Sequence, residues 1–148
     1  MAQNIILIET STALCSVALA ENGAVTAYRE SSAPKAHASL TAVFTQEMLE
    51  ERGLSLADCD AVCVSKGPGS YTGLRVGVST AKGLCFGSKK PLLAVGTLDT
   101  LVSQALCHPE FTCHPERSEG SLYKYIIPMI DARRMEVYAP GRAPQHRF

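Results

Sequence analysis

The stretch AVCVSKGPGSYTGLRVGVSTAKGLCF, residues 61–86, joins two structural patterns through one glycine-rich turn. Ala61–Ser65 is a short apolar run of the kind that forms a buried strand. After the turn, apolar residues recur every three or four positions, which predicts a helix from about Ser70 to Phe86 that ends at Gly87. A buried strand that turns directly into a helix is a building unit of α/β proteins. The stretch therefore predicts an α/β domain.

The residues before this stretch predict three strands and a helix. Ile5–Ile8, Cys15–Ala20 and residues 24–30 read as strands, and the Asn-Gly pair at positions 22–23 predicts a hairpin between the second and the third. Beyond Pro34 the apolar spacing becomes helical from Ala36 to about Arg52, and Gly53 follows as a stop signal. An antiparallel meander followed by a helix is therefore expected.

The residues after the stretch continue the alternation of strands and helices. Pro91–Val95 predicts a strand, and Thr97 is expected to cap a helix over residues 98–106. Tyr125–Asp131 predicts a further strand, near an edge because it contains a proline. This order is the layout of the ribonuclease-H-like half-domain used by actin-like ATPases, a mixed sheet with helices on both faces. A shared topology alone says little about function.

The expected domain covers residues 1–139, with one insertion and a tail. The insertion, residues 107–123, contains CHPE twice and has no hydrophobic period. Two Cys–His pairs suggest zinc, but zinc sites use tighter cysteine spacing and converging side chains, so a solvated loop is the preferred interpretation. Residues 140–148 also lack a period and are expected to form an irregular tail.

The composition limits the classes of partner. The 148 residues carry 14 basic and 14 acidic side chains, whereas a protein that grips RNA alone normally has a basic excess. The sequence has neither a signal peptide nor an apolar run of membrane-spanning length. Its six cysteines form no C-x-x-C pair, which favours a reduced, cytoplasmic protein over a disulfide scaffold.

The glycine turn matches neither nucleotide-binding fingerprint. A Walker A loop requires a Gly-Lys-Ser/Thr triplet, and the dinucleotide motif requires a glycine where Thr72 stands. The preferred interpretation is a structural turn in which Ser70 or Thr72 caps the following helix, although helix N–H groups can also bind an anion. No catalytic, cofactor-binding or metal-binding residue is predicted. The four histidines do not form H-E-x-x-H, and His37 is expected to be an exposed or capping residue.

The helix after the glycine turn has a wide arc of apolar and small residues. Gly73 and Gly77 each cost helix stability relative to alanine, which makes sense if another backbone comes close. The preceding helix has a second, weaker apolar edge. The predicted partner interface therefore comprises Ala38, Ala42, Leu49, Gly73, Val76, Gly77, Thr80 and Leu84.

Five segments together resemble the bacterial TsaB family, also called YeaZ. They are ILIETSTALCSVAL, KAHASL, SKGPGSYTGLRVGVSTAKGL, PLLAVGTLDTL and MIDARRMEVYA, in this order. The positions that match the family motifs are Glu9, His37, Gly67, Pro68, Gly69, Ser70, Thr72, Gly73, Arg75, Asp131, Arg133 and Glu136.

The resemblance implies a non-catalytic subunit of the complex that transfers a threonylcarbamoyl group to the tRNA adenosine 3′ of the anticodon. It implies as partners the catalytic paralogue TsaD, the ATPase TsaE and a second copy in a homodimer, with tRNA reached only through the complex. The alternative is an ATP-dependent kinase or hydrolase of the actin-like superfamily. The family's chain continues into a second half-domain, whereas this sequence ends at Phe148, so that half is expected to be missing. A non-functional fragment is a third interpretation.

Overall fold

The computed structural model describes residues 3–33, 36–107, 126–133 and 136–140. The chain forms β1 (Asn4–Glu9), β2 (Cys15–Glu21), β3 (Ala24–Ser31), α1 (Ala36–Glu51), a 3-10 turn (Leu56–Asp58), β4 (Ala61–Ser65), α2 (Tyr71–Ser88), β5 (Leu92–Val95), α3 (Thr97–Cys107), β6 (Ile130–Arg133) and β7 (Glu136–Tyr138). The order of elements up to α3 is the predicted one. None of the described helices combines the length and the apolar character needed to cross a bilayer.

The first five strands form one mixed sheet in the order β3-β2-β1-β4-β5. β1 pairs antiparallel with β2 and parallel with β4, and β5 extends the parallel part. Asn22 and Gly23 both have positive φ angles, 54° and 83°, as a two-residue hairpin turn between β2 and β3 requires. The predicted meander and mixed sheet are confirmed.

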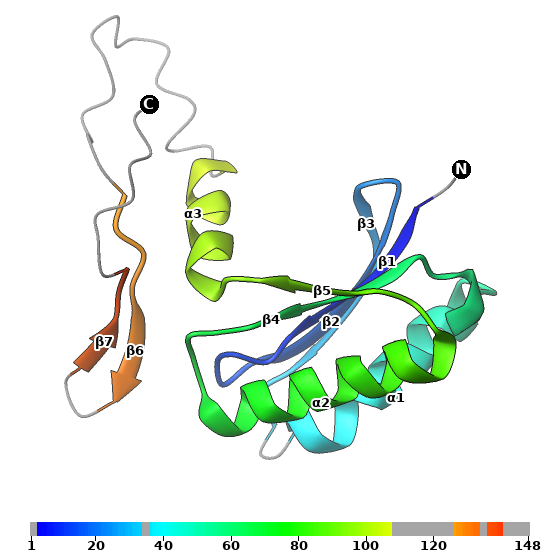
Figure 1. The fold of residues 1–148 in the computed structure, drawn as a ribbon, viewed down its shortest axis with the longest axis horizontal. Coiled ribbons are helices and arrows are strands. Elements are labelled where there is room, and N and C mark those ends of the chain that lie inside the picture. Colours follow the sequence, from blue (N-terminus) through cyan, green and yellow to red (C-terminus); the bar gives the residue numbers. More distant parts are fainter. Residues whose placement is uncertain (1–2, 34–35, 108–125, 134–135, 141–148) are drawn as a thin grey trace, which may run out of the picture.

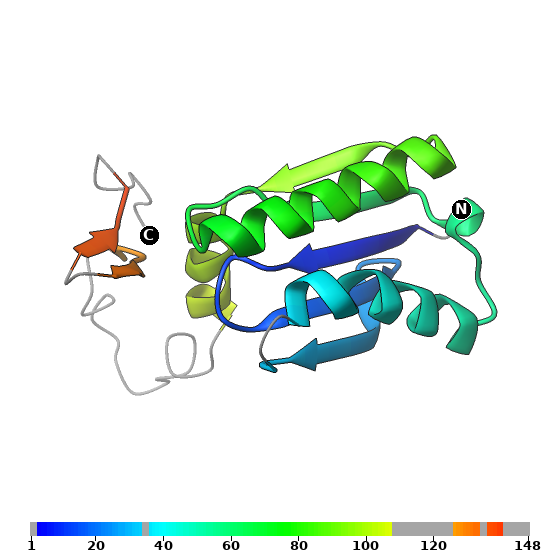
Figure 2. The same cartoon turned by 90° about the horizontal axis from the view of Figure 1, so that it is seen from below.

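Helices α1 and α2 lie side by side on one face of the sheet (Figures 1 and 2). Alternate residues of the three central strands point toward them, because successive side chains of a strand face opposite ways. These residues form the core together with one side of each helix. Its strand members are Ile6, Ile8, Val17, Leu19, Val62 and Val64, and its helix members include Met48, Leu49, Ala81 and Cys85.

The cysteines behave as small core residues. Cys15, Cys59 and Cys85 are buried free thiols, and Cys63 is half-buried. Burial raises the pKa of the thiols of Cys59, Cys63 and Cys85. A thiol with a raised pKa is a poor nucleophile at neutral pH, so these side chains contribute packing rather than chemistry.

Helix α3 leaves the end of β5 on the side of the sheet opposite α1 and α2 (Figure 1). The predicted N-cap, Thr97, is wrong, because Thr97 is the first helical residue and its hydroxyl is buried without a protein partner. Gly96 takes the cap position instead, since its carbonyl accepts the N–H of Thr100 at 3.1 Å. The backbone N–H of Thr97 is bonded to Gly67 O at 3.0 Å, which ties α3 to the glycine turn.

The strand predicted over Tyr125–Asp131 is only partly correct. Residues 126–129 are not in a strand, and β6 begins at Ile130. β6 pairs antiparallel with β7 in a separate two-stranded sheet, so it does not extend the main sheet. The CHPE insertion beyond Cys107 and the irregular tail from residue 141 lie outside the described residues.

The 3-10 turn before β4 is held by a capping box. Asp58 Oδ2 accepts hydrogen bonds from the backbone N–H of Ser55 at 2.8 Å and from its hydroxyl at 2.6 Å. The Ser55 hydroxyl, and next its N–H, lower the pKa of Asp58 below the usual aspartate value. The ionised carboxylate is therefore the form that the folded chain prefers.

We expect Asp58→Asn to lower the urea midpoint of unfolding at neutral pH. Because the folded-state pKa is depressed, this stabilisation is complete above the aspartate's unfolded-state pKa and is lost as the pH falls through its folded-state pKa. The two midpoints should therefore converge in acid. Ser55→Ala should remove most of the same pH dependence, whereas a constant gap between Asp58→Asn and the parent at all pH values would contradict the assignment.

Candidate functional site

The glycine turn, residues 66–70, connects β4 to α2 at the carboxyl edge of the sheet. The peptide bond between Gly67 and Pro68 is cis, and Gly67 has a φ of 99°. Gly69 packs directly on the loop after β1, since a Cβ atom there would lie 2.4 Å from the carbonyl oxygen of Ser11. Contacts below 3.0 Å do not occur for real Cβ atoms, so the second glycine of the turn is needed for this close approach.

Several backbone groups of the turn are bonded within the chain. Ser70 N–H donates to Ser11 O at 2.6 Å, and Gly67 O accepts from Thr97 N–H at 3.0 Å. The Ser70 side chain caps α2 by accepting the N–H of Gly73 at 3.3 Å, as one of the two sequence alternatives predicted. The turn therefore joins β1, α2 and α3, and two of the N–H groups that could meet an anion are already used.

Glu9 and His37, the motif residues before the turn, support the loop that it packs on. Glu9 Oε1 accepts the N–H of Ser11 at 2.6 Å. The half-buried His37 ring places Nε2 3.0 Å from Thr12 O. Both side chains thus hold residues 10–12 in place. In the part of the chain that the structure describes, no group of three or more His, Cys, Asp or Glu side chains is arranged to hold a metal ion.

The predicted motif residues divide into two groups. Those from Glu9 to Arg75 lie around the glycine turn and the first turns of α2. Asp131 and Glu136 are exposed residues of the β6–β7 hairpin. Arg133 is in β6, and its side chain lies outside the described residues. The structure therefore gathers the first group and leaves the second on a separate element.

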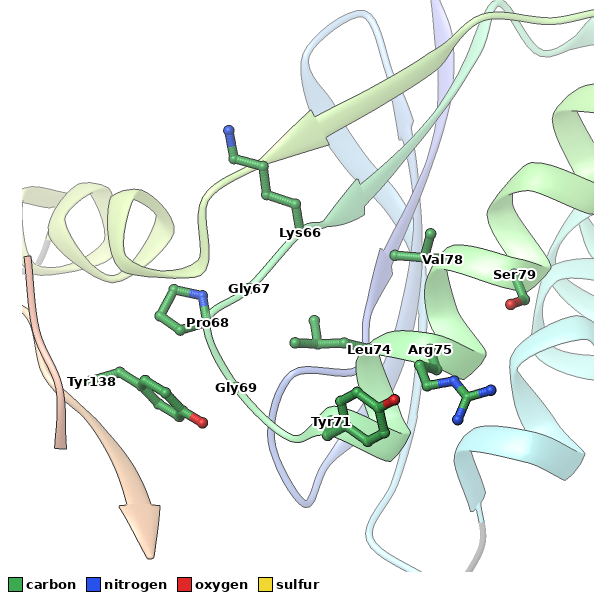
Figure 3. A pocket seen from close by; sticks show the side chains of 10 residues that line it. All are labelled: Lys66, Gly67, Pro68, Gly69, Tyr71, Leu74, Arg75, Val78, Ser79 and Tyr138. Atoms are coloured by element: carbon green, nitrogen blue, oxygen red, sulfur yellow. The ribbon is translucent and has the colours of Figure 1, made fainter. Parts of the chain in front are cut away.

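A cavity of about 470 Å³ lies beside the glycine turn (Figure 3). Lys66 and Arg75 supply the charged groups of its lining, and Tyr71 and Tyr138 supply aromatic rings. The guanidinium of Arg75 lies 5.4 Å from the ring centre of Tyr71, within the range of a cation–π contact. The sequence interpretation missed both tyrosines. Tyr71 stands next to the predicted cap, but nothing in the sequence indicates that β7 brings Tyr138 to this place.

Three residues of the predicted partner interface are buried within the chain instead. A Cβ atom on Gly73 would lie 2.1 Å from Thr10 O, and one on Gly77 would lie 2.1 Å from Thr10 Oγ1. The close approach that explains these glycines is therefore made by the chain's own β1–β2 loop. Leu49 is 6% exposed and belongs to the core.

The other predicted interface residues are at least partly accessible on α1 and α2, although Leu84 also packs against the core. Ala38 and Ala42 are exposed, and Val76, Thr80 and Leu84 are half-buried. Two apolar residues of these helices were missed, Val43, which is 43% exposed, and Phe86, which is 90% exposed. We call these seven residues the helix surface. Phe86 could have been found from the sequence, because it stands in line with Arg75, Ser79 and Lys82 on the polar strip of α2.

Comparisons with known proteins agree on one group. Residues 30–144 match the family model of TsaD, tRNA N6-adenosine threonylcarbamoyltransferase. The chain is 37% identical over 134 residues to the tRNA threonylcarbamoyladenosine biosynthesis protein TsaB of Escherichia coli, covering 90% of this chain and 52% of that protein. The corresponding protein of Haemophilus influenzae is 36% identical over 138 residues, with 92% and 53% covered. The chain thus spans about half the length of the curated relatives it matches.

A solved structure supports the same group. YeaZ from Pseudomonas aeruginosa superposes with a TM-score of 0.76 at 30% identity, and the match covers 93% of this chain and 58% of that one. The fold is therefore the predicted actin-like, ribonuclease-H-like α/β fold. The threonylcarbamoyltransferase of Maricaulis maris is 32% identical over 117 residues, but these cover only 28% of that protein. Because the TsaB proteins of Escherichia coli and Haemophilus influenzae match more residues than the Maricaulis maris protein, at higher identity, the chain belongs to the TsaB family, also called YeaZ.

Proposed function

We propose that this chain acts as a non-catalytic subunit in the synthesis of threonylcarbamoyladenosine in tRNA. Its proposed partner is the catalytic paralogue TsaD, with the ATPase TsaE joining the pair, and tRNA is contacted only through the complex. The TsaB relatives are tRNA threonylcarbamoyladenosine biosynthesis proteins, which supports this pathway. The same relatives do not favour the alternative of an actin-like kinase or hydrolase. The proposed location is the cytoplasm, where tRNA is modified.

The observation that carries the non-catalytic role is the bonding of the glycine turn. A loop that binds phosphate presents free backbone N–H groups and usually a lysine to the anion. Here the N–H of Ser70 is bonded to Ser11 O, and the N–H of Gly73 is bonded to the side chain of Ser70. These bonds leave fewer N–H groups of the turn for a phosphate, which supports the interpretation that the turn mainly holds β1, α2 and α3 together.

The helix surface is the proposed contact with TsaD. The apolar side chains of Phe86 and Val43 are open to solvent, on the two helices that carry the other accessible residues of the helix surface. Both lie on the outer side of the helix pair, away from the sheet, where a second pair of helices can pack against them. A homodimer through the same surface is the competing occupant.

The proposal is tested by mixing the purified chain with TsaD of the same organism. We expect a complex on size exclusion, and we expect the chain alone to hydrolyse no ATP above the buffer rate. Transfer of the threonylcarbamoyl group to tRNA by TsaD and TsaE, supplied with threonylcarbamoyl-adenylate, should rise when the chain is added. An ATPase activity that follows the chain through purification and disappears when Gly69 is replaced by a bulky residue that leaves the fold intact would contradict the proposal.

A further inference from the structure

Among the residues that the structure describes, the strand β5 forms an uncovered edge of the main sheet. It pairs on one side with β4, and all four of its residues are exposed. Leu92, Leu93 and Val95 are 36%, 43% and 41% exposed, so apolar side chains are open on both faces of this edge. An apolar edge strand without charges is a template for pairing with another strand.

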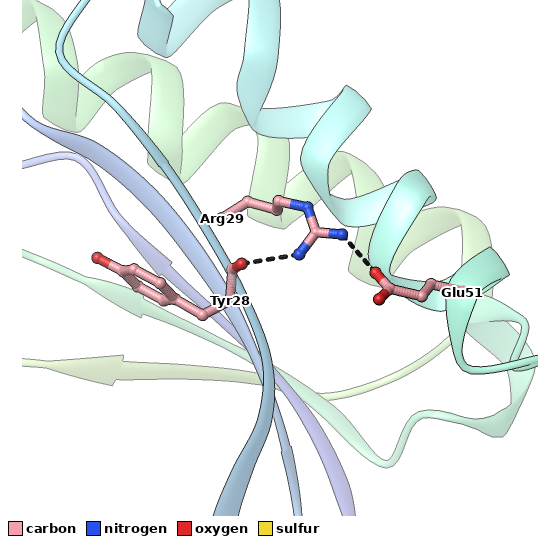
Figure 4. Close-up of polar contacts among 3 residues, drawn as sticks. All are labelled: Tyr28, Arg29 and Glu51. Carbon is pink, nitrogen blue, oxygen red and sulfur yellow. Dashed lines mark hydrogen bonds and ion pairs between the residues drawn. The ribbon is translucent and has the colours of Figure 1, made fainter.

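The opposite edge of the same sheet, β3, carries the protection that β5 lacks. Arg29 points toward α1 and forms an ion pair with Glu51 (Figure 4). Its neighbour Glu30 adds a second charge, and a bulge at Leu19/Ala20 interrupts the register between β2 and β3. Charges and bulges are the usual devices that keep an edge from pairing. Of the two edges of the sheet, β5 is therefore the one that is open to pairing with another strand.

The register of β5 decides which of its backbone groups are free. Pro91 O accepts from Val62 N–H at 3.1 Å, and Val95 O accepts from Lys66 N–H at 2.9 Å. Because alternate residues of a strand direct their N–H and C=O groups to opposite sides, residues 91, 93 and 95 face β4. Leu92 and Ala94 therefore direct their N–H and C=O groups away from the sheet.

We propose that β5 pairs antiparallel with β5 of a second copy of this chain, about a two-fold axis at Leu93. Leu92 of one copy then lies opposite Ala94 of the other, and the two such pairs exchange four backbone hydrogen bonds. Leu93 lies opposite its own equivalent in the closely spaced pair, where two apolar side chains touch. This surface is distinct from the helix surface, so the proposal does not depend on the proposed function.

The charges at the ends of β5 favour this antiparallel arrangement. Counting outward from Leu93 places Lys90 of one copy opposite Gly96 of the other. The Asp99 carboxylate lies directly beside Gly96, with Oδ2 2.3 Å from the place a Cβ atom would take there. At each end of the paired strands the register thus places Lys90, which also interacts with Asp58 of its own chain, beside Asp99 of the other copy. A parallel pair would instead bring Lys90 beside Lys90, which argues against it.

The test is sedimentation of the full 148-residue chain over a concentration series. Four hydrogen bonds and a small apolar contact predict a dimer with a Kd on the order of 100 µM. Ala94→Pro removes an N–H that only the second copy uses, and should weaken the dimer at least about tenfold. Ala94→Ser, which keeps the N–H, should leave the Kd unchanged. All measurements are repeated in the Val43→Arg background, which weakens association through the helix surface, so that the remaining dimer can be assigned to β5.

A charge exchange keeps the proposal testable if Ala94→Pro fails to fold. Lys90→Glu alone should weaken the dimer, and Lys90→Glu combined with Asp99→Lys should restore it. A chain that stays monomeric at millimolar concentration overturns the proposal and leaves the edge to a strand of another protein. A dimer that neither Ala94→Pro nor Lys90→Glu weakens overturns it as well.

Discussion

Gly73→Ala is expected to destabilise the folded chain by about 3 kcal/mol or more, the largest effect of any single methyl group added to α2. The new Cβ atom would lie 2.1 Å from the backbone oxygen of Thr10. No side-chain rotation relieves this contact, because one partner is main chain and the other is part of a helix. The first turns of α2 must therefore move away from the β1–β2 loop, and the glycine turn loses its support. Urea unfolding followed by circular dichroism measures the loss.

Gly83→Ala is the matched control for this substitution. Gly83 lies in the same helix, and a Cβ atom there meets nothing within 4 Å. An alanine at this exposed helical position should stabilise the chain by about 1 kcal/mol through helix propensity alone. We expect Gly73→Ala to lower the free energy of unfolding and Gly83→Ala to raise it. Equal changes would mean that Thr10 does not pack against α2 as described.

Val43→Arg is expected to weaken binding to TsaD by about 100-fold, or about 2.7 kcal/mol, while leaving the fold intact. Val43 is on the outer side of α1 and 43% exposed, so the isolated chain accommodates the arginine in water. In a packed helix interface the same guanidinium would be desolvated without a partner, which is costly. Calorimetric titration against TsaD measures the affinity.

Val25→Arg provides the control for a charge placed on an exposed valine. Val25 is 61% exposed and lies on β3, away from both helices. The Val25→Arg substitution should change neither the free energy of binding to TsaD nor the free energy of unfolding by more than about 0.5 kcal/mol. If Val43→Arg binds as the parent does, the α1 side of the helix surface is not part of the contact. Phe86→Asp then shows whether the α2 side of the surface acts without α1.

The sequence predicted the order of elements well, because period and turn residues are local signals. The Asn-Gly hairpin, the strand before the glycine turn and a cap for α2 at Ser70 or Thr72 all followed from residues a few positions apart. The start of α3 was misjudged for a related reason. Glycine and threonine both serve at the N-cap, and only the carbonyl of Gly96 accepting from Thr100 decides between them.

The candidate site was less predictable, since it depends on contacts between distant residues. Helical spacing placed Gly73 and Gly77 on one side of α2, but it does not say what covers that side. The covering group is Thr10, some sixty positions earlier in the chain. Likewise Leu49 has the spacing of a second apolar edge, yet α1 turns it into the core. Tyr138 reaches the cavity from β7 through a hairpin whose position the sequence does not specify.

The seating of Thr10 between two turns of α2 also has an evolutionary consequence. The obstacle at Gly73 is the main chain, which every amino acid at position 10 possesses, so we expect no relative of this fold to tolerate a side chain there. The obstacle at Gly77 is the threonine hydroxyl, which a mutation can delete. Lineages that replaced Thr10 by glycine would thus have been free to acquire alanine at position 77, whereas alanine at position 10 keeps a Cβ atom 3.2 Å away. Position 73 should therefore be glycine throughout the family. The residue at position 77 should vary together with the residue at position 10.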